Sequence, residues 1–508
     1  MMSFWAPALL ALYYSVLVVL SFYGLHRLVL VALYLHTRRR TMPPPELPDD
    51  PLAWPIVTVQ LPLYNEMYVA ERLIDAVCRL DYPAGRLEIQ VLDDSTDETT
   101  EIVARAVAAY RQRGVDIHHR HRTDRTGFKA GALAAGLATA RGELLAIFDA
   151  DFVPAPDFLK KSVPYFADPR LGMVQGSWAH INRGYSLLTR VEAILLDGHF
   201  MIEHAARNRS GCFFNFNGTA GVWRRTAIES AGGWEHDTLT EDLDLSYRAQ
   251  LRGWRFLYLP ELAVPSELPV DVNGFKSQQH RWAKGAVQTG RKLLGRILRA
   301  PLPLRVKMEA FVHLTNNASY PLTVLLALLI FPAMMLRRGT SVRMLLIVDL
   351  PLFLSATVSL LAFYLMSQIA AGEGWRRKVR YLPALMGVGI GLSVNNARAV
   401  LSGLFQRGGT FHRTPKYRIE RRGQDWFAKR YRAGTDPTRL IEVGLALYFL
   451  GCTIYAWVAG MWMSIPFLYL FMQGYGYMAV LSYLPSLREW WTRVKAGGAA
   501  AGAAGAGP

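Results

Sequence analysis

The chain has 508 residues, of which 51% are hydrophobic and 19% are charged, and its formal net charge is +17. This length is too great for one ordinary domain, and the apolar composition favours a membrane protein. The excess of Lys and Arg is not accompanied by a nucleic-acid-binding motif, so we expect it to meet anionic lipid headgroups rather than nucleic acid. The three cysteines are scattered, which argues against a disulfide framework or a cysteine-based metal site.

The chain opens with an apolar run that is interrupted by His26 and Arg27 and continues to Leu35. This run is long enough to cross a bilayer and too long for a signal-peptide core, so we expect a retained anchor over residues 1–37. Three further uncharged runs are Ala310–Leu336, Leu350–Gly372 and Val443–Leu487. They predict two membrane helices within residues 308–372 and two within 438–487. A disordered Ala/Gly-rich tail is expected over 488–508.

A shorter apolar run, Tyr381–Ala397, is expected to lie along the membrane interface rather than to cross. The basic cluster Arg38–Arg40 places the following polar domain in the cytoplasm of a cell-membrane protein. The loop Gln406–Arg432 carries nine basic and two acidic residues, so it should be cytoplasmic too. That placement requires the shorter run not to cross. Residues 378–435 are therefore predicted to form an interfacial helix and a basic loop.

Between residues 50 and 300, short β-rich runs alternate with helical stretches. Strands are expected at Ile56–Leu61, Leu87–Leu92 and Leu144–Phe148, and helices at Glu71–Leu80 and Thr99–Arg111. This order predicts an α/β domain with a mostly parallel sheet covered by helices, in which ligands bind at the carboxyl ends of the strands. An amphipathic helix near 276–300 should lie at the membrane interface.

Carboxylates follow two of these strands directly. Asp93 and Asp94 also suit the capping of the next helix, a role that is compatible with contact to a nucleotide base or ribose. Asp149 and Asp151 suit a Mg²⁺ or Mn²⁺ ion that carries a diphosphate, because these ions prefer oxygen ligands. Asp149 should also contact the sugar or ribose. Lys129 lies between glycines that allow close backbone approach, so we expect it to contact the diphosphate.

Thr240, Glu241 and Asp242 open a predicted helix, where acidic residues also stabilise the N-terminus. The catalytic interpretation makes Asp242 the general base for an acceptor hydroxyl, with Glu241 beside it and Thr240 at the acceptor. This interpretation requires an acceptor hydroxyl within hydrogen-bond reach of the carboxylate.

Gln278, Arg281 and Trp282 have the spacing of one helix face. Arg281 suits bidentate contact with a pyrophosphate, with Gln278 on the same nucleotide sugar. Trp282 suits stacking on the acceptor sugar, and the alternative is an aromatic membrane-interface anchor. Taken together, the motifs indicate a membrane enzyme that transfers a sugar from a nucleotide donor.

In order and spacing, these motifs resemble those of the processive inverting glycosyltransferases of family 2, the cellulose synthase superfamily. The stretches Val59–Glu66, Gln90–Asp97 and Phe128–Leu133 resemble the plant cellulose synthase-like A and C branches. The resemblance implies a GT-A fold, Mg²⁺ or Mn²⁺, and UDP-glucose or GDP-mannose as the donor. It further implies a hexosyltransferase that polymerises a β-1,4-glucan, mannan or glucomannan on a growing polysaccharide and translocates the product.

Phe411, Thr414 and Lys416 resemble the gating loop of cellulose synthases, which closes over the bound nucleotide. The residue before Thr414 is apolar in that family and is Arg413 in this chain. The family's Phe-x-Cys-Gly acceptor segment is replaced by Asn215–Ala220. Both departures leave the details of gating and acceptor binding open.

Two other functions agree with part of the sequence. A non-processive glycolipid glucosyltransferase, similar to ceramide glucosyltransferase, shares the Arg-Trp motif, but the plant-like flanks and the loop argue against it. A transporter or receptor with a degenerate enzyme domain predicts missing carboxylates, and none of the expected ones is missing. The sugar, the base and the linkage are left open by the sequence, which is also compatible with an oligomer.

Overall fold

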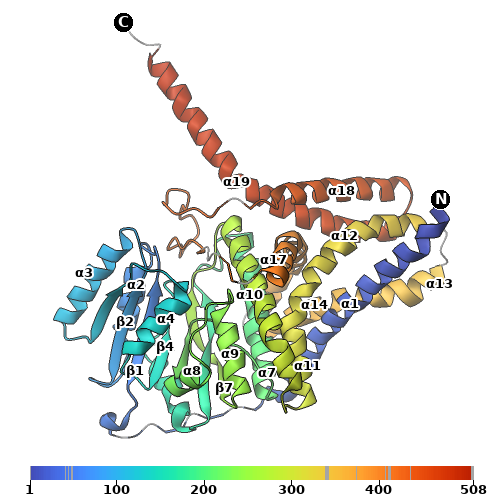
Figure 1. Cartoon of the computed structure of the whole chain (residues 1–508). Helices are drawn as coiled ribbons and strands as arrows, with labels where there is room; N and C mark the ends of the chain where they lie inside the picture. The colour runs from blue at the N-terminus through green and yellow to red at the C-terminus, as the bar shows by residue number, and fades with distance from the viewer. Residues whose placement is uncertain are drawn as a thin grey trace.

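The computed structural model describes residues 2–40, 42–43, 45–46, 48, 50–337, 342–372, 374–406, 408–409, 413–434 and 436–504. The chain forms an α/β domain beside a bundle of long helices, and α10 (Val272–Arg299) lies between the two parts (Figure 1). The predicted combination of an α/β domain and a helical bundle is confirmed.

A seven-stranded sheet with the order β3-β2-β1-β4-β6-β5-β7 forms the centre of the α/β domain. Its strands are β1 (Val57–Leu63), β2 (Leu87–Asp93), β3 (Ile117–His121), β4 (Leu144–Ile147), β5 (Leu171–His180), β6 (Gly221–Arg224) and β7 (Arg255–Ser266). In the described sheet, β6 runs antiparallel to β4 and β5, and the other neighbours are parallel. The three predicted strands β1, β2 and β4 are confirmed, with ends shifted by at most two residues.

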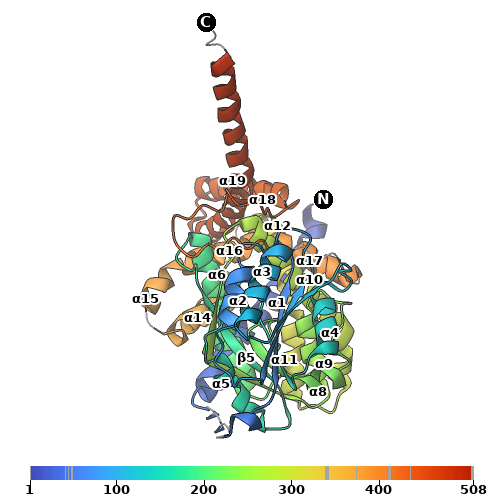
Figure 2. The ribbon, with the colours of Figure 1, turned by 90° about the vertical axis from the view of Figure 1, so that its left-hand side faces the viewer.

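Helices cover both faces of the sheet, and residues of the strands contribute to a hydrophobic core on each face. Along β4, Leu144 and Ala146 pack into one core, whereas Leu145 and Ile147 pack into the other. The first core includes residues of α2 (Ala70–Val77) and α3 (Thr99–Gln112), which confirm the two predicted helices. The second core is covered by α4 (Phe128–Thr139), α8 (Arg225–Ser230) and α9 (Glu241–Leu251), which gather on one side of the sheet (Figure 2).

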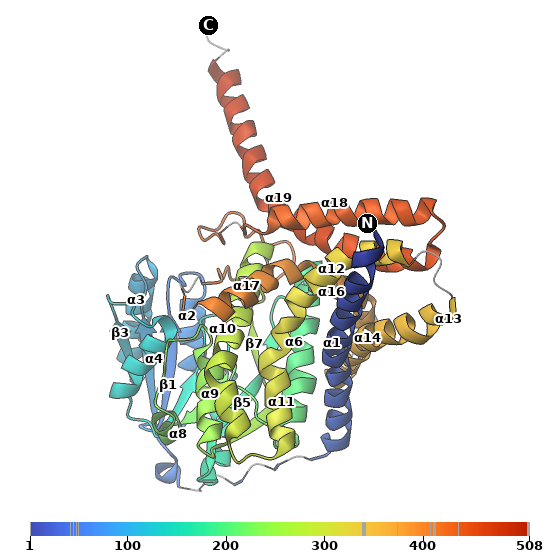
Figure 3. The same ribbon diagram turned by 45° about the vertical axis from the view of Figure 1, so that its right-hand side comes forward.

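Four of the described helical segments are long and apolar enough to cross a membrane, namely Trp5–Thr37, Leu304–Leu336, Leu346–Ala370 and Arg439–Val458. They correspond to α1 (Met2–Thr37), α11 (Leu304–Thr315) with α12 (Ser319–Leu336), α14 (Leu350–Ala370) with the turn before it, and α18 (Arg439–Val458). The first of them, α1, packs against both α12 and α14 (Figure 3). Membrane association through several apolar helices therefore agrees with the sequence prediction.

The segment predicted to lie along the interface forms two helices, α16 (Leu382–Gly391) and α17 (Ser393–Phe405). Together with the residues from Trp375, these helices are long and apolar enough to cross a membrane only as a pair, and the pair is bent by 42°. One of them, α17, packs against α10, and α16 packs against α6 (Leu187–Asp197) and α19 (Ile465–Ala504). Whether this pair lies along the interface or crosses as a broken span stays a prediction, as do the domain boundaries.

The C-terminal helix α19 packs along α18 in its first half and then projects away from the body of the protein (Figure 1). It continues to Ala504, where the sequence predicted a disordered tail over 488–508. Alanine has the highest intrinsic helix propensity, which accounts for the difference. The last residues, 505–508, lie outside the described part of the chain.

Candidate active site

A polar cavity opens at the carboxyl ends of β1 and β4. Most of the residues that the sequence predicted for the site line it, namely Asp94, Lys129, Asp149, Asp151, Thr240, Glu241, Asp242, Gln278, Arg281, Trp282, Thr414 and Lys416. They come from strand ends, from the first turns of α4 and α9, from one face of α10 and from the basic loop before α18. The tertiary structure thus brings together motifs that are spread over more than 300 residues of sequence.

Two predicted site residues are not among those that line the cavity. Asp93 is fully buried behind Asp94, where its carboxylate interacts with His119 Nε2 at 3.0 Å and with His121 Nδ1 at 3.3 Å. Burial by itself raises the pKa of Asp93, but hydrogen bonds from His119 and Ser95 outweigh it and hold the pKa well below its usual value. The carboxylate is therefore an ionised structural support beneath the site, and its contact with a donor stays a prediction. Phe411 lies outside the described residues.

Asp149 lies two residues beyond β4, and its carboxylate forms an ion pair with a lysine. Lys129 Nζ, from the first turn of α4, donates to Asp149 Oδ1 at 2.5 Å and to the carbonyl oxygen of Gly218 at 2.8 Å. Burial lowers the pKa of Lys129, but the charges of Asp149 and Glu241 raise it more, so the net shift is upward. The ammonium stays protonated and places a fixed positive charge in the cavity.

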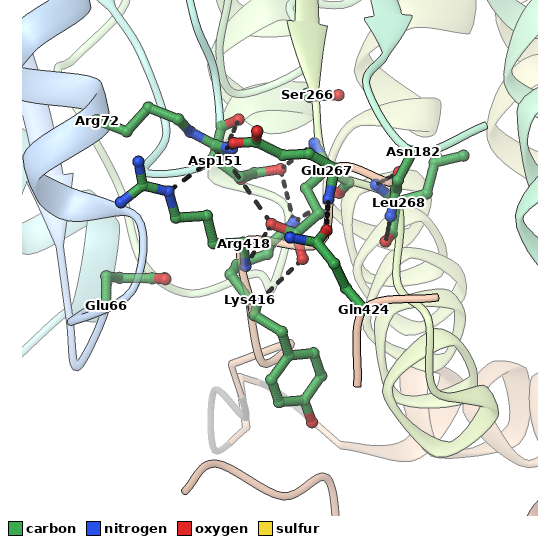
Figure 4. A network of polar contacts seen from close by, with 12 residues as sticks. Glu66, Arg72, Asp151, Asn182, Ser266, Glu267, Leu268, Lys416, Arg418 and Gln424 are labelled. Atoms are coloured by element: carbon green, nitrogen blue, oxygen red, sulfur yellow. Dashed lines mark hydrogen bonds and ion pairs between the residues drawn. The ribbon is translucent and has the colours of Figure 1, made fainter. Parts of the chain in front are cut away.

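Asp151 also carries a lysine, which comes from the loop before α18 (Figure 4). Lys416 Nζ donates to Asp151 Oδ2 at 2.8 Å, and the backbone N–H of Glu267 donates to the same oxygen at 3.2 Å. The buried carboxylate of Glu267 accepts from the backbone N–H groups of Tyr417 at 3.0 Å and Arg418 at 2.9 Å. Glu267 therefore fastens the loop to the end of β7, with Lys416 against the Asp-x-Asp pair.

The pair Asp149 and Asp151 fits a hard divalent cation. Both carboxylates face one cavity, and each is compensated by an ammonium, which shows that the site requires positive charge. Oxygen ligands of this kind are those that Mg²⁺ and Mn²⁺ prefer. Among the described residues, two other acidic or histidine clusters have closely spaced ligand atoms, but neither cluster lies in the lining of this cavity.

Asp242 occupies the first turn of α9, where its Oδ1 accepts from the backbone N–H of Leu243 at 2.8 Å. Burial and the neighbouring Glu241 raise its pKa to about 7, against the opposing charge of Lys129. A carboxylate with this pKa can take up a proton near neutral pH. Its surroundings are tight: a Cβ at Gly218, which has φ +80°, would lie 3.0 Å from Asp242 Oδ2.

The motif on α10 presents Gln278, Arg281 and Trp282 to the same cavity, as their spacing predicted. Burial lowers the pKa of Arg281, and the charges of Glu241 and Asp149 counteract this. A guanidinium remains charged at such values, so Arg281 adds a further fixed positive charge to the cavity. The centroid of the Trp282 ring lies 6.4 Å from that of Trp178, with 56° between the planes.

Several lining residues were not predicted as site residues. Glu66, which follows β1, pairs with Arg413 at 2.8 Å, and burial raises the pKa of Glu66 to about 7. The guanidinium of Arg125 lies 3.3 Å from the centroid of the Tyr64 ring. Tyr64 and Glu66 could have been found, because they follow a parallel strand just as Asp149 does. Trp178 carries no comparable signal in the sequence.

A second cavity shares a wall with the first. The residues that line both are Trp178, Leu196, Asn217, Thr240, Asp242, Gln278 and Trp282. From this wall the second cavity extends among α6, η3 (Gly198–His204), α10, α14 and α17, and thus into the helical bundle. Asp242 is consequently accessible from a cavity in the α/β domain and from a cavity that leads towards the membrane helices.

Comparisons with known proteins agree with this geometry. The family described as "Glycosyltransferase like family 2" matches residues 55–285. Glucomannan 4-beta-mannosyltransferase 7 of Arabidopsis thaliana is 35% identical over 469 residues, which cover 85% of this chain and 78% of that protein. Glucomannan 4-beta-mannosyltransferase 2 of the same plant is 45% identical over 251 residues, which cover 48% of this chain and 47% of that protein.

Among solved structures, the mannosyltransferase PcManGT from Pyrobaculum calidifontis, in complex with GDP-Man and Mn²⁺, has a similar fold. The TM-score is 0.51 at 23% sequence identity, and the match covers 77% of this chain and 99% of that one. The likeness extends over the α/β domain and beyond it, and it confirms the predicted GT-A fold.

Proposed function

The chain belongs to the family 2 glycosyltransferases, and we propose that it is a membrane-embedded hexosyltransferase that builds a β-1,4-linked mannan or glucomannan. The observation that supports this proposal best is the position of Asp242 in the wall between two cavities. One cavity holds fixed carboxylates and cations that suit a nucleotide sugar, and the other leads into the helical bundle and suits a growing chain. Of the two donors predicted from the sequence, GDP-mannose accords with the mannosyltransferase relatives.

The donor diphosphate lies against the cations of the first cavity in this proposal. Asp149 and Asp151 would hold Mg²⁺ or Mn²⁺, which supplies positive charge to the diphosphate when it is bound. Lys129 and Arg281 add two fixed positive charges, which stabilise the negative charge that develops on the leaving nucleoside diphosphate. Because burial excludes competing water, these charges act more strongly than they would in solution.

Asp242 acts as the general base. It takes the proton of the acceptor hydroxyl while that oxygen attacks the anomeric carbon from the side opposite the diphosphate, and the bond to the diphosphate breaks. An α-linked donor thereby gives a β-linked product, and the proton remains on Asp242 until solvent removes it. The pKa of about 7 suits this role, since the carboxylate is ionised in a large fraction of molecules at neutral pH.

Trp282 and Trp178 offer aromatic faces at the wall where the acceptor sugar meets Asp242. Aromatic rings bind sugar faces without fixing their position along the chain, which suits a polymer that must advance after each addition. The elongated chain then passes through the second cavity between the membrane helices. The basic cluster at Arg38–Arg40 supports a cytoplasmic α/β domain in a cell membrane, so the product would leave on the opposite side.

The loop that carries Thr414 and Lys416 closes the first cavity over the donor in this proposal. It is fastened to the α/β domain by Glu267, Glu66 and Glu98, through their contacts with Arg418, Arg413 and Arg430 respectively. Such contacts exclude water and keep the donor in place during transfer.

The test uses the full chain, purified in lipid nanodiscs, with radiolabelled GDP-mannose and UDP-glucose supplied separately and together with Mg²⁺ or Mn²⁺. Insoluble product that β-mannanase digests, absent with Asp242→Asn, would support the proposal. Only a short, lipid-soluble product would contradict polymer synthesis, and no turnover of either donor would contradict the enzymatic assignment.

A further inference from the structure

The second cavity has a volume of about 310 Å³ and one wall that is unusually polar for a space among membrane helices. The stripe Glu192, Leu195, Leu196, His199 and Glu203 faces it from α6 and η3. The turn Gly198–His204 is a π-helix, a rare conformation that frequently marks functional sites. Glu203 in this stripe is paired with Arg27 at 2.8 Å, whereas Glu192 is 2% exposed. A carboxyl group is costly to bury, so Glu192 requires an explanation beyond packing.

A chain of hydrogen bonds fixes the side chain of Asn217 at the wall between the cavities. Asn217 Nδ2 lies 2.8 Å from His199 Nε2, and Asn217 Oδ1 lies 2.5 Å from His204 Nε2. His199 Nδ1 lies 3.1 Å from Glu203 Oε2. One assignment satisfies all of these contacts: His199 donates from Nδ1 to Glu203 and accepts at Nε2 from Asn217, and His204 donates from Nε2 to Asn217. The amide is therefore held in one orientation.

This arrangement leaves half of the amide's capacity unused. A primary amide offers two N–H donors and two oxygen lone pairs. The two histidines take one donor and one lone pair from the Asn217 side chain. Asn217, like Asp242, is among the residues that line both cavities, so the remaining donor and lone pair are available to a ligand there. A sugar hydroxyl, which donates and accepts at once, complements such a pair.

Other polar atoms around the cavity also lack a partner among the described residues. They are Oε1 of Glu192, Oδ1 of Asn215, Nε1 of Trp178 and Nδ2 of Asn396. Glu192 is 2% exposed and Asn215 is 7% exposed, so solvent does not compensate for the missing hydrogen bonds. Buried polar atoms are nearly always paired in native proteins, and four exceptions around one cavity point to a polyhydroxylated ligand.

We propose that Asn217 is a specificity-determining residue for the acceptor, and this inference rests on the proposed function. Its amide, fixed by His199 and His204, reads the orientation of a ring hydroxyl on the acceptor's terminal sugar. Mannose and glucose differ in the orientation of one hydroxyl. An amide held in one orientation can form hydrogen bonds to this hydroxyl in one of the two sugars, and its donor and lone pair stay unpaired when the other sugar is bound. His199 and Glu203 are positioning residues, since they act through Asn217.

The experiment compares the binding of two probes, β-1,4-mannotetraose and cellotetraose, to the full chain in nanodiscs with GDP present. In the unmodified chain we expect the two Kd values to differ by about tenfold, the value of one or two hydrogen bonds. Asn217→Ala should bring the ratio close to one. His199→Gln, which can still accept and donate, should keep more of the preference than His199→Leu.

Asn208→Ala is the matched control, because the Asn208 side chain bonds to the backbone of Phe256 and Tyr258, and Asn208 is not among the described residues that line the two cavities. It should leave the ratio unchanged. A ratio near one in the unmodified chain, or the same preference in Asn217→Ala with an unchanged melting temperature, would overturn the inference. Turnover of GDP-mannose is measured on the same samples, and its absence in the unmodified chain would contradict the proposed function instead.

Discussion

Removal of the charge on Glu241 should move the pH profile of catalysis to lower pH. Burial and Glu241 raise the pKa of Asp242 to about 7, and Lys129 opposes them. Because the base must be ionised to accept a proton, kcat of the unmodified chain should be about tenfold higher at pH 8 than at pH 6.

The size of the shift follows from the repulsion between two neighbouring carboxylates. At a partly buried position this repulsion is about 1–2 kcal/mol, and 1.36 kcal/mol corresponds to one pKa unit. Glu241→Gln removes the repulsion and lowers the pKa of Asp242, so the midpoint of the profile should fall to about pH 6. Lys129→Met removes an attraction and should move the midpoint in the opposite direction, above pH 7.

The assay is the initial rate of transfer from radiolabelled GDP-mannose at saturating donor and metal, between pH 5.5 and 8.5, with full-length protein in nanodiscs. Asp242→Asn supplies the background, and we expect its rate to be lower by about 10²- to 10⁴-fold at every pH. If Glu241→Gln leaves the midpoint in place or raises it, or if both charge variants shift it in one direction, Asp242 is not the group that titrates.

Gly218→Ala should lower kcat at least tenfold, because the new Cβ would lie 3.0 Å from Asp242 Oδ2 and a φ of +80° costs a non-glycine residue about 1–2 kcal/mol. A variant with unchanged kcat would contradict the tight packing around Asp242. Lys416→Met should tighten Mn²⁺ binding about five- to tenfold, because the ammonium no longer competes with the metal ion for Asp151. Electron paramagnetic resonance titrations without nucleotide measure this binding, and a weaker affinity would show that the lysine does not occupy the cation's place. Lys276→Met should destabilise the protein by about 3–5 kcal/mol, because the buried lysine bonds two acidic groups and a serine that link α10 to α18 and α19. The measurement is the melting temperature in nanodiscs, which should fall, and an unchanged value would contradict this account.

The strand-and-helix pattern of the α/β domain could be predicted because its signal is local. In the strand β1, for example, Val57, Val59, Leu61 and Leu63 recur at every second position, which is the local pattern of a strand, and all four are buried. The C-terminal tail behaved differently. Its Ala/Gly composition was interpreted as disorder, but alanine also favours helix, and α19 continues to Ala504.

The candidate site could be predicted where carboxylates follow strands or open helices. This rule predicts Asp149 and Asp242, and both line one cavity, while their roles stay predictions. Asp93 also follows a strand, but its side chain contacts two histidines of β3 and does not line the cavity. The sequence did not specify that β3 pairs with β2. Local pattern thus placed each residue at the correct strand end but did not determine the direction of its side chain.

By itself, the sequence determined which residues supply charge and aromatic surface, because residue types and short spacings decide acidity, helix faces and membrane-length apolar runs. Only the tertiary structure decided which of these groups meet. Lys416 reaches Asp151 across 265 positions of sequence, and Asn217 is oriented by histidines from a separate π-helical turn. The physical reason is that burial and long-range contacts set the pKa of Asp242 and the orientation of Asn217. Neither quantity depends on neighbouring residues alone.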